Sequence, residues 1–446
     1  MKAIRNVKIR FTAALFVFIL AFSLFPLTAS AAVDITDPTS VALYAVSGGE
    51  MLAAKELDSP VAPASTAKIM SGLLFCEAFL EKDEDCKSNE KLQREITVTS
   101  EMLSGVSGRK LGLASGDVLT LEALLYSAVG GGYNDATHVL ACTVAGSVDA
   151  FTEKMNARAA ELGASSTHFK NPTGLDAEGA TTTARDVVKI SLAAAESRAF
   201  LKMTSFYTYK VAFANGTSVS IENRNLLHFP RADSNKWYTN EAVGMSVGMT
   251  DDGGYCLVTL GRFGNADFLC VVLGASEEDE AYSVATQLLG WANDRYEVVT
   301  LRPAGEHLGS LPVSLSDTYN KIDIVLESDV TMTVPRGAAL DEAYTYELHL
   351  DFDGLKAPIK KGEAVGRLDV MNNGRVVASA AAVTAMDVEA NGFLSAVDAM
   401  KTFFTSPIFF IMLGVILLVS AISFAIYSRG GRRYSRRHSS YRRRFY

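Results

Sequence analysis

The sequence predicts an α+β fold: an antiparallel sheet flanked by helices, then a small C-terminal β-domain and one transmembrane helix. After residue 31, two strand-like runs come first, helical patterns follow, and strands return before a last helix. Strand patterns without helical spacing follow residue 298 and predict the second domain. The predicted organisation is a signal peptide at 1–31, a first domain at 32–298, a β-domain at 299–388, a connector at 389–405, a transmembrane helix at 406–428 and a basic tail at 429–446.

The first domain opens with a predicted hairpin, because residues 39–57 alternate in a strand-like way around Gly48 and Gly49. Thr120 and Thr183 stand where helix N-caps are expected, and Asp186 is placed to close a capping box on Thr183. Apolar spacing predicts helices at 65–81, 120–129, 134–145, 149–162, 183–196 and 278–295, and strands at 206–213, 217–221, 243–248, 254–262 and 267–273.

The second domain is predicted to consist of strands, with a hairpin turn at Asn373-Gly374. The predicted strands are Lys321 to Leu326, Val330 to Val334, Tyr344 to Phe352, Ala364 to Met371 and Arg375 to Ala382. The whole chain has 446 residues, of which 48% are hydrophobic. This length and composition support a large core and exclude a disordered protein.

The two ends of the chain indicate export and a membrane anchor. Basic residues at the N-terminus precede an apolar run at 11–27 and a small-residue cleavage site, Ala29-Ser30-Ala31, a pattern typical of a secretory signal peptide. An uncleaved anchor helix is the alternative. Residues 402–428 carry no charge, and eight arginines follow. Because positive charge stays on the cytoplasmic side, we expect a single-pass protein of the cell membrane, with its body on the extracytoplasmic face.

Composition excludes several classes of function. Residues 32–428 hold 30 basic and 50 acidic groups, and this acidic body is not expected to bind nucleic acid. Five cysteines cannot form a complete set of intrachain disulfides; whether Cys76 and Cys86 pair stays open. The six histidines show no metal-ligand spacing, so we expect no metal site and no cofactor.

Ser65 and Lys68 are the candidate catalytic pair. They lie three residues apart at the start of a predicted helix, so both side chains share one face. A partly buried lysine has a lowered pKa and can act as the base of a neighbouring serine. The helix N-terminus also favours a developing oxyanion. The Ser-x-x-Lys spacing is common by itself, and the motifs that follow it carry the assignment.

Several short motifs follow this pair in order: Asn134-Asp135-Ala136, Asn171-Pro172-Thr173-Gly174-Leu175-Asp176, Thr182-Thr183-Ala184-Arg185-Asp186 and Val271-Val272-Leu273-Gly274-Ala275. The order resembles the low-molecular-mass penicillin-binding proteins, which are serine-type D-alanyl-D-alanine carboxypeptidases. The resemblance covers residues 39 to about 295 and implies a β-lactamase/DD-peptidase-like fold there. The later unit, with Ala357-Pro358, Lys361-Gly362 and Gly366, resembles that family's C-terminal β-domain.

The resemblance also implies a reaction and the residues that carry it. Ser65 would be the nucleophile of an acyl-enzyme and Lys68 its general base, while the Met249 backbone N–H would pair with that of Ser65 as an oxyanion hole. The implied substrate is the D-Ala-D-Ala end of a peptidoglycan stem peptide, and β-lactams are implied acylating inhibitors. The implied substrate-binding residues are Asn134, Ser246, Gly248, Met249 and Thr250.

Two motifs of the family are incomplete in this chain. Where the family has Ser-x-Asn, this chain has Gly132-Tyr133-Asn134, so a proton-relaying hydroxyl is absent. Where the family has Lys-Thr-Gly, this chain has Ser246-Val247-Gly248, so the ammonium that binds the terminal carboxylate and lowers the pKa of Lys68 is absent. These losses cost about 3–6 kcal/mol of transition-state binding, unless Arg109 or another cation replaces the lysine.

Three functions therefore stay open. The first is a membrane-anchored carboxypeptidase with weak activity, supported by Ser65 and Lys68. The second is a catalytically impaired pseudoenzyme that binds peptidoglycan or scaffolds cell-wall partners, supported by Gly132 and Ser246. The third is a β-lactamase, which is disfavoured because that family has no stalk-like β-domain and this chain has no Glu-x-x-x-Asn loop.

Overall fold

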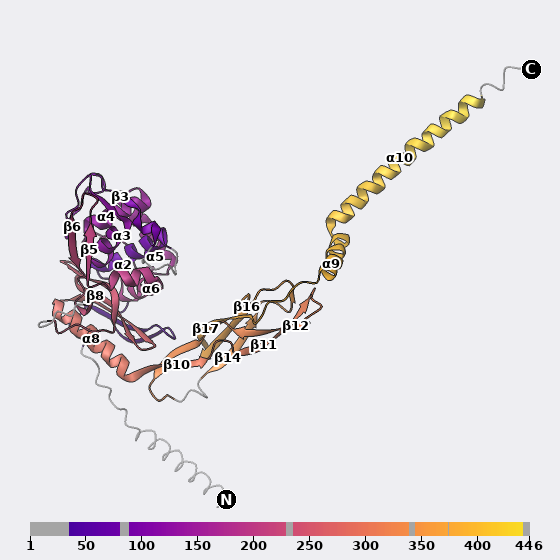
Figure 1. The fold of residues 1–446 in the computed structure, drawn as a ribbon. Coiled ribbons are helices and arrows are strands. Elements are labelled where there is room, and N and C mark those ends of the chain that lie inside the picture. Colours follow the sequence, from indigo (N-terminus) through magenta and orange to yellow (C-terminus); the bar gives the residue numbers. More distant parts are fainter. Residues whose placement is uncertain (1–34, 81–88, 229–234, 339–343, 373, 440–446) are drawn as a thin grey trace, which may run out of the picture. The chain divides into compact units, whose positions relative to one another are not determined.

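The computed structural model describes residues 35–80, 89–228, 235–338, 344–372 and 374–439, with side chains up to residue 425 (Figure 1). The predicted signal peptide and Cys86 lie outside these residues. The chain forms two compact units. The first contains the residues up to 299 together with 332–338, and the second contains 300–331 and the residues from 339 onward.

A five-stranded antiparallel sheet forms the centre of the first unit. The strand order is β2 (Glu50–Lys55), β1 (Ser40–Ala45), β9 (Ala266–Ala275), β8 (Gly254–Phe263) and β7 (Ala242–Thr250). The predicted hairpin at 39–57 is formed by β1 and β2, which pair directly. β7 is the last strand in this order, so its outer edge keeps backbone groups available for another chain.

Both faces of this sheet are buried. On one face, Leu43 and Phe268 pack with residues of α8 (Glu278–Arg295). On the other face, Ala42 and Val271 pack with residues of α6 (Ala184–Ala195), and α2 (Ala67–Phe79) belongs to the same hydrophobic cluster. Neighbouring residues of β1 thus face opposite layers, as the two-residue period of a strand requires. The predicted α+β arrangement, an antiparallel sheet flanked by helices, is confirmed.

The helical layer contains the segments that hold the candidate site. The 3-10 turn η1 (Ala64–Thr66) runs directly into α2, and the π-helical turn η3 (Tyr126–Gly130) lies between α3 (Leu121–Leu125) and α4 (Asn134–Ala145). The remaining helices are α5 (Val148–Glu161), α6 (Ala184–Ala195), α7 (Arg198–Thr204), η2 (Glu90–Gln93) and η4 (Leu226–His228). Two small hairpins complete the unit, β3 (Glu95–Thr97) with β4 (Val118–Thr120) and β5 (Thr208–Ala212) with β6 (Ser218–Glu222).

The predicted helix caps are correct, but the capping box is not. Thr120 accepts a hydrogen bond from the Ala123 backbone N–H, and Thr183 accepts one from the Asp186 backbone N–H. The Asp186 carboxylate does not turn back to Thr183. It accepts hydrogen bonds from the Ser166 backbone N–H at 2.8 Å and from the Thr167 hydroxyl at 3.0 Å, because these donors lie closer in the folded chain.

The second unit is strand-rich. Its six-stranded sheet has the order β14 (Thr345–Leu350), β16 (Ala364–Asn372), β17 (Arg375–Thr384), β12 (Lys321–Leu326), β11 (His307–Ser314) and β15 (Leu355–Lys356). The predicted strand at 330–334 is β13 (Val330–Pro335), which pairs with β10 (Tyr296–Arg302) in a separate two-stranded sheet that includes residues of the first unit. Asn373 of the predicted turn lies outside the described residues, but Asn372 and Arg375 on either side of the turn are paired.

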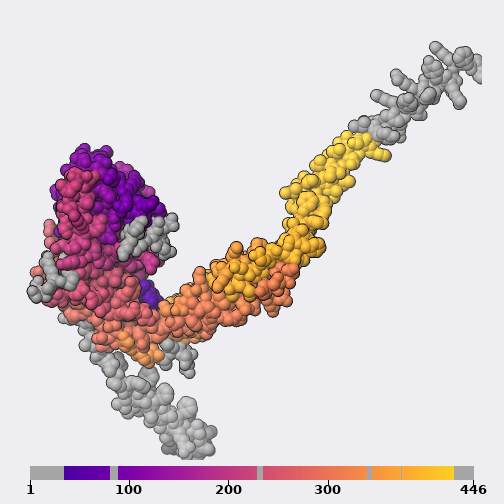
Figure 2. All heavy atoms as spheres, viewed as in Figure 1, coloured from indigo at the N-terminus to yellow at the C-terminus, as the bar shows by residue number. Residues whose placement is uncertain are grey.

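Two helices follow the β-strands, α9 (Gly392–Thr405) and α10 (Pro407–Ser439). The stretch Pro407–Ala425 of α10 is long and apolar enough to cross a membrane, and it is the one such helix among the described residues. Its 19 residues span about 29 Å, close to the roughly 30 Å of a bilayer core. None of this stretch is buried, and Figure 2 shows its side chains uncovered.

Candidate active site

Ser65 lies in η1, where the chain meets the edge strand β7. The residue is only 9% exposed. Gly248 of β7 approaches so closely that a Cβ on Gly248 would stand 1.9 Å from Ser65 Oγ. Because only glycine permits this approach, β7 and the Ser65 hydroxyl form one wall of the site.

Lys68 lies one turn after Ser65, at the start of α2, and is 8% exposed. Its Nζ donates a hydrogen bond to the Thr173 carbonyl at 2.6 Å rather than to Ser65 Oγ. Burial, followed by the positive charges of Arg224 and Arg109, lowers the pKa of Lys68 to about 7. A large fraction of this amine is therefore unprotonated near pH 7, which suits a group that must accept a proton from Ser65.

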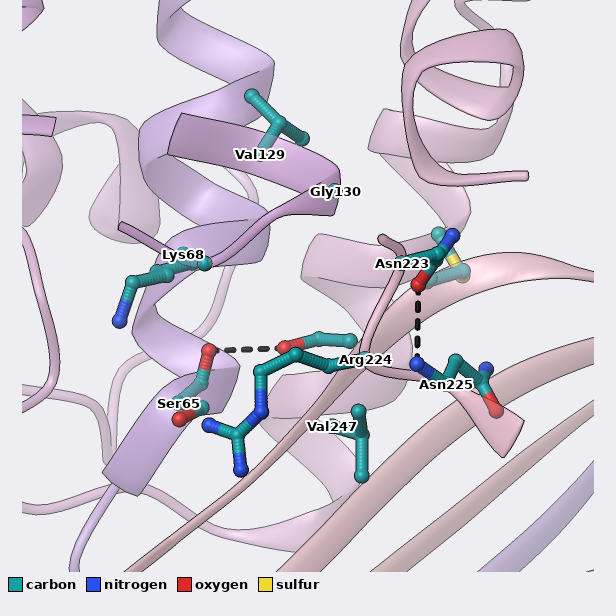
Figure 3. Close-up of a pocket in the computed structure, with 11 residues that line it drawn as sticks. Ser65, Lys68, Val129, Gly130, Asn223, Arg224, Asn225 and Val247 are labelled. Carbon is teal, nitrogen blue, oxygen red and sulfur yellow. Dashed lines mark hydrogen bonds between the residues drawn. The ribbon is translucent and has the colours of Figure 1, made fainter. Parts of the chain in front are cut away.

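Ser246 replaces the lysine of the third motif and has a different contact. It lies on β7, and its Oγ donates a hydrogen bond to the Ser65 carbonyl oxygen at 2.9 Å, the bond drawn at Ser65 in Figure 3. Ser246 carries no charge. Its hydrogen bond fixes the backbone of η1 against β7, and Ser246 does not replace the positive charge of the motif lysine.

Arg224 supplies a positive charge that the sequence analysis did not identify. Its side chain lines the same pocket as Ser65 and Lys68, and its guanidinium group lies beside Ser65 in Figure 3. A Cβ on Gly248 would lie 3.7 Å from Arg224 Nη1, so the guanidinium and Ser65 Oγ both lie against Gly248. Burial, followed by the charge of Arg109, lowers the pKa of Arg224, but a guanidinium remains protonated in proteins.

The two neighbours of Arg224 hold it in place. Asn223 and Asn225 are both buried. The Asn223 side chain donates to the Thr204 carbonyl at 2.7 Å and accepts from the Asn225 backbone N–H at 2.9 Å. The Asn225 side chain donates to the Gly244 carbonyl at 3.1 Å, which ties the segment to β7. The Asn-Arg-Asn segment is thus fixed on both sides of the arginine that enters the pocket.

Gly132 lines the pocket at the chain position where the family has the hydroxyl of its second motif. Its φ is +69°, in the left-handed region that glycine adopts without strain. A Cβ on Gly132 would lie 3.6 Å from Arg224 Cδ. The stem of Arg224 therefore packs against the residue that has lost the hydroxyl of the second motif.

The start of α4 fixes the neighbouring loop at 107–113. The Asn134 side chain donates to the Ser107 carbonyl at 2.8 Å, and its backbone N–H donates to the Arg109 carbonyl at 2.8 Å. Asn134 Oδ1 is buried and has no hydrogen-bond partner among the described residues. The Asp135 carboxylate, also buried, accepts backbone N–H bonds from Leu111, Gly112 and Leu113.

The remaining predicted residues lie toward the end of β7. Met249 is 46% exposed, and the Thr250 hydroxyl accepts a hydrogen bond from the Gly253 backbone N–H in the turn to β8. Neither residue lines the pocket that contains Ser65 and Lys68. The pocket brings together Ser65, Lys68, Gly132 and Ser246 of the residues named from the sequence, and adds Val129, Gly130, Asn223, Arg224, Asn225, Met245 and Val247.

Comparison with protein families identifies the chain. Residues 28–277 match the family model for D-alanyl-D-alanine carboxypeptidase, and residues 296–390 match the C-terminal domain of penicillin-binding protein 5. Because the first match covers more than half of the chain, this protein belongs to the serine-type D-alanyl-D-alanine carboxypeptidase family, as its motifs predicted.

Individual relatives agree with this family. The chain is 28% identical over 351 residues to D-alanyl-D-alanine carboxypeptidase DacF of Bacillus subtilis, covering 78% of this chain and 85% of the relative. It is 28% identical over 392 residues to DacC of Escherichia coli, covering 86% and 92%.

Solved structures show the same fold. Penicillin-binding protein 5 of Haemophilus influenzae matches 79% of this chain and 98% of its own, with a TM-score of 0.59 and 24% identity. A peptidoglycan synthesis regulatory factor (PBP3) of Streptococcus pneumoniae matches 79% and 99%, with a TM-score of 0.64 and 18% identity. The predicted combination of a DD-peptidase-like fold and a C-terminal β-domain is confirmed.

Proposed function

We propose that this chain is an active, membrane-anchored carboxypeptidase that removes the terminal D-Ala of peptidoglycan stem peptides through an acyl-enzyme on Ser65. The observation that carries the proposal is Arg224 in the pocket beside Ser65 and Lys68. This guanidinium offers a partner for the terminal carboxylate, and its charge contributes to the low pKa of Lys68. Both tasks of the missing motif lysine thus have a candidate residue.

Acylation begins with unprotonated Lys68, which takes the proton of Ser65 Oγ. The oxygen attacks the carbonyl carbon of the penultimate D-Ala, and the carbonyl oxygen gains negative charge in a tetrahedral intermediate. The C–N bond then breaks, and the terminal D-Ala leaves with its amine protonated. Gly132 has no hydroxyl to relay that proton, so the Lys68 ammonium delivers it directly.

Deacylation uses the same base a second time. Lys68, again unprotonated, takes a proton from a water molecule, whose oxygen attacks the ester carbonyl of acylated Ser65. The ester C–O bond breaks, and Lys68 returns its proton to Ser65 Oγ. The products are a peptide shortened by one residue and the free enzyme. Because one group performs each transfer without a relay, we expect slower turnover than in relatives with complete motifs.

A binding function without turnover is the second candidate, and one observation favours it. Lys68 Nζ donates to the Thr173 carbonyl, so the base must leave this bond or share it before it can act on Ser65. The engaged Lys68 amine and the missing hydroxyl at Gly132 would both slow catalysis. They therefore favour a pseudoenzyme that holds peptidoglycan for cell-wall partners.

The membrane anchor is proposed from α10 and the residues after it. Pro407–Ala425 would span the bilayer, with the arginine-rich tail on the cytoplasmic side. Large apolar side chains of α9, such as Phe393 and Met400, are exposed just before this stretch. Protease added to wall-stripped cells should then digest the body and spare a tag after Tyr446. Protection of the body would contradict this topology.

The proposed reaction is tested by release of free D-Ala from a soluble pentapeptide ending in D-Ala-D-Ala. We expect slow release by the wild type, none by Ser65→Ala, and a strong reduction in Lys68→Ala and Arg224→Gln. Binding of the pentapeptide without any release would instead support the pseudoenzyme.

A further inference from the structure

Two guanidinium groups flank Gly132. Arg109 is bonded to both neighbours of this glycine: its Nε donates to the Gly131 carbonyl and its Nη2 to the Tyr133 hydroxyl, each at 3.1 Å. Its guanidinium carbon also lies 4.4 Å from the centre of the Tyr133 ring. Arg224 packs its stem against Gly132 itself. The two arginines come from distant segments and meet at the residue that lost the second-motif hydroxyl.

Neither guanidinium has an acidic partner among the described residues. The Arg109 contacts are a carbonyl, a hydroxyl and an aromatic ring, all neutral. The Arg224 side chain makes no hydrogen bond within the described chain, and Glu278 acts on it only through space. The two cations also repel each other, since the charge of Arg109 lowers the pKa of Arg224. A bound anion would relieve this repulsion.

The pocket lined by Arg224 and Gly132 is chemically suited to one carboxylate, and Arg109 lies beside Gly132 through its bonds to Gly131 and Tyr133. No aspartate or glutamate lines it. Arg109 uses two of its guanidinium N–H groups in these hydrogen bonds, and its other N–H groups remain available. All the guanidinium N–H groups of Arg224 remain available to a ligand. A guanidinium and a carboxylate form strong, charge-assisted and often bidentate hydrogen bonds.

The position relative to Ser65 indicates which carboxylate binds. Gly132 and Ser65 line the same pocket, and Arg224 Nη1 lies against Gly248 next to Ser65 Oγ. In a peptide, successive Cα atoms are about 3.8 Å apart, so the C-terminal carboxylate lies one residue from the carbonyl that Ser65 attacks. An anion held at Gly132 would lie in the same pocket as that carbonyl.

We propose that Arg109 is a specificity-determining residue, which together with Arg224 binds the substrate's C-terminal carboxylate from two sides at Gly132. This inference rests on the proposed carboxypeptidase function and deepens it. Arg109 makes the site demand a free C-terminus: a peptide that ends in an amide presents no charge to the two guanidinium groups and is rejected.

The test measures binding, so it does not depend on turnover. Full-length protein carrying Ser65→Ala is titrated calorimetrically with two matched peptides, one ending in D-Ala-D-Ala carboxylate and the other in D-Ala-D-Ala amide. In this background we compare Arg109→Gln with Lys110→Gln, which removes a charge from the adjacent exposed residue. Arg109→Lys keeps the charge but loses the planar fork.

We expect the Ser65→Ala protein to bind the carboxylate peptide at least tenfold tighter than the amide peptide. Arg109→Gln should weaken carboxylate binding by roughly five- to thirtyfold and leave amide binding unchanged, Arg109→Lys should fall between, and Lys110→Gln should have little effect. Unchanged amide binding also shows that Arg109→Gln is folded.

Three results would overturn the inference: equal losses for both peptides in Arg109→Gln, no loss for either, or an equal effect of Lys110→Gln. If wild-type protein also failed to release D-Ala while these binding differences persisted, the carboxypeptidase proposal alone would fail, and Arg109 would remain the carboxylate-selecting residue of a binding protein. If neither peptide bound at all, both proposals would fail.

Discussion

Ser246 Oγ donates a hydrogen bond to the carbonyl oxygen of Ser65, which links the edge strand β7 to the turn that carries the proposed nucleophile. The residue that replaces the family lysine therefore has a structural contact of its own. We propose that Arg224, which lines the same pocket and comes from a different segment, supplies the charge of that lysine.

Removing the Ser246 hydroxyl should loosen η1. We expect Ser246→Ala to slow acylation of Ser65 and to lower the free energy of unfolding by about 1 kcal/mol, the usual contribution of one hydrogen bond. Ser246→Lys should not exceed the wild-type rate, because it removes the same bond and adds a cation beside Arg224. Acylation rates with a chromogenic β-lactam check both variants. A clear gain in Ser246→Lys would show that Arg224 does not replace the motif lysine.

Gly248 should tolerate no side chain. A Cβ on this residue would overlap Ser65 Oγ, and neither the β7 backbone nor η1 can move without breaking the contact between them. We expect Gly248→Ala to abolish acylation while the β-domain and the rest of the first unit stay folded. The matched control is Gly290→Ala in α8, where a Cβ meets nothing within 4 Å. Wild-type acylation by Gly248→Ala would contradict the packing described for Ser65.

The pH dependence of acylation should report Lys68. Its pKa is about 7, and the unprotonated amine is the active form, so the rate should fall about tenfold per unit below pH 7 and level off above it. Arg224→Gln removes a repelling charge, so the midpoint should move to higher pH at saturating inhibitor. Pre-steady-state acylation rates from pH 5 to 9 measure both midpoints. A midpoint that Arg224→Gln leaves unchanged would argue against electrostatic coupling between the two residues.

Restoring a side chain at Gly132 should cost stability. The positive φ of this residue disfavours any L side chain, so Gly132→Ser and Gly132→Ala should each lose about 1–2 kcal/mol of unfolding free energy. Both Cβ atoms would also contact the Arg224 stem, and we expect both variants to acylate more slowly than wild type. Chemical denaturation and acylation rates measure the two effects. Equal stability of Gly132→Ser and wild type would show that the backbone here differs from the structure.

Local patterns predicted most of the first unit, and tertiary contacts explain what they missed. The helix at 278–295 is present because its apolar spacing matches burial against β8 and β9, and the strand at 243–248 is present within β7. The short helix α7 was missed because seven residues give too few turns for a period. Asp186 was misassigned because its partners, Ser166 and Thr167, are near only in the folded chain.

The sequence predicted those site residues that lie close together in one short segment. Ser65 and Lys68 are three residues apart, so helical spacing alone places them together. Arg224 stands 159 residues after Ser65, and no local pattern shows that its segment meets β7. The sequence feature that could have identified Arg224 is its place between two asparagines, Asn223 and Asn225, just after a predicted strand. The hydrogen bond from Lys68 to the Thr173 carbonyl could not be predicted either, because a backbone acceptor has no sequence signature.

Covalent labelling by a β-lactam shows whether Ser65 forms an acyl-enzyme. Full-length wild-type protein is incubated with a β-lactam at high concentration, and its intact mass is followed for hours beside Ser65→Ala and Lys68→Ala. We expect a wild-type adduct of one drug mass, mapped by peptide digestion to Ser65, much slower labelling of Lys68→Ala and none of Ser65→Ala. The absence of any wild-type adduct, or an adduct that persists in Ser65→Ala, would show that Ser65 is not the nucleophile.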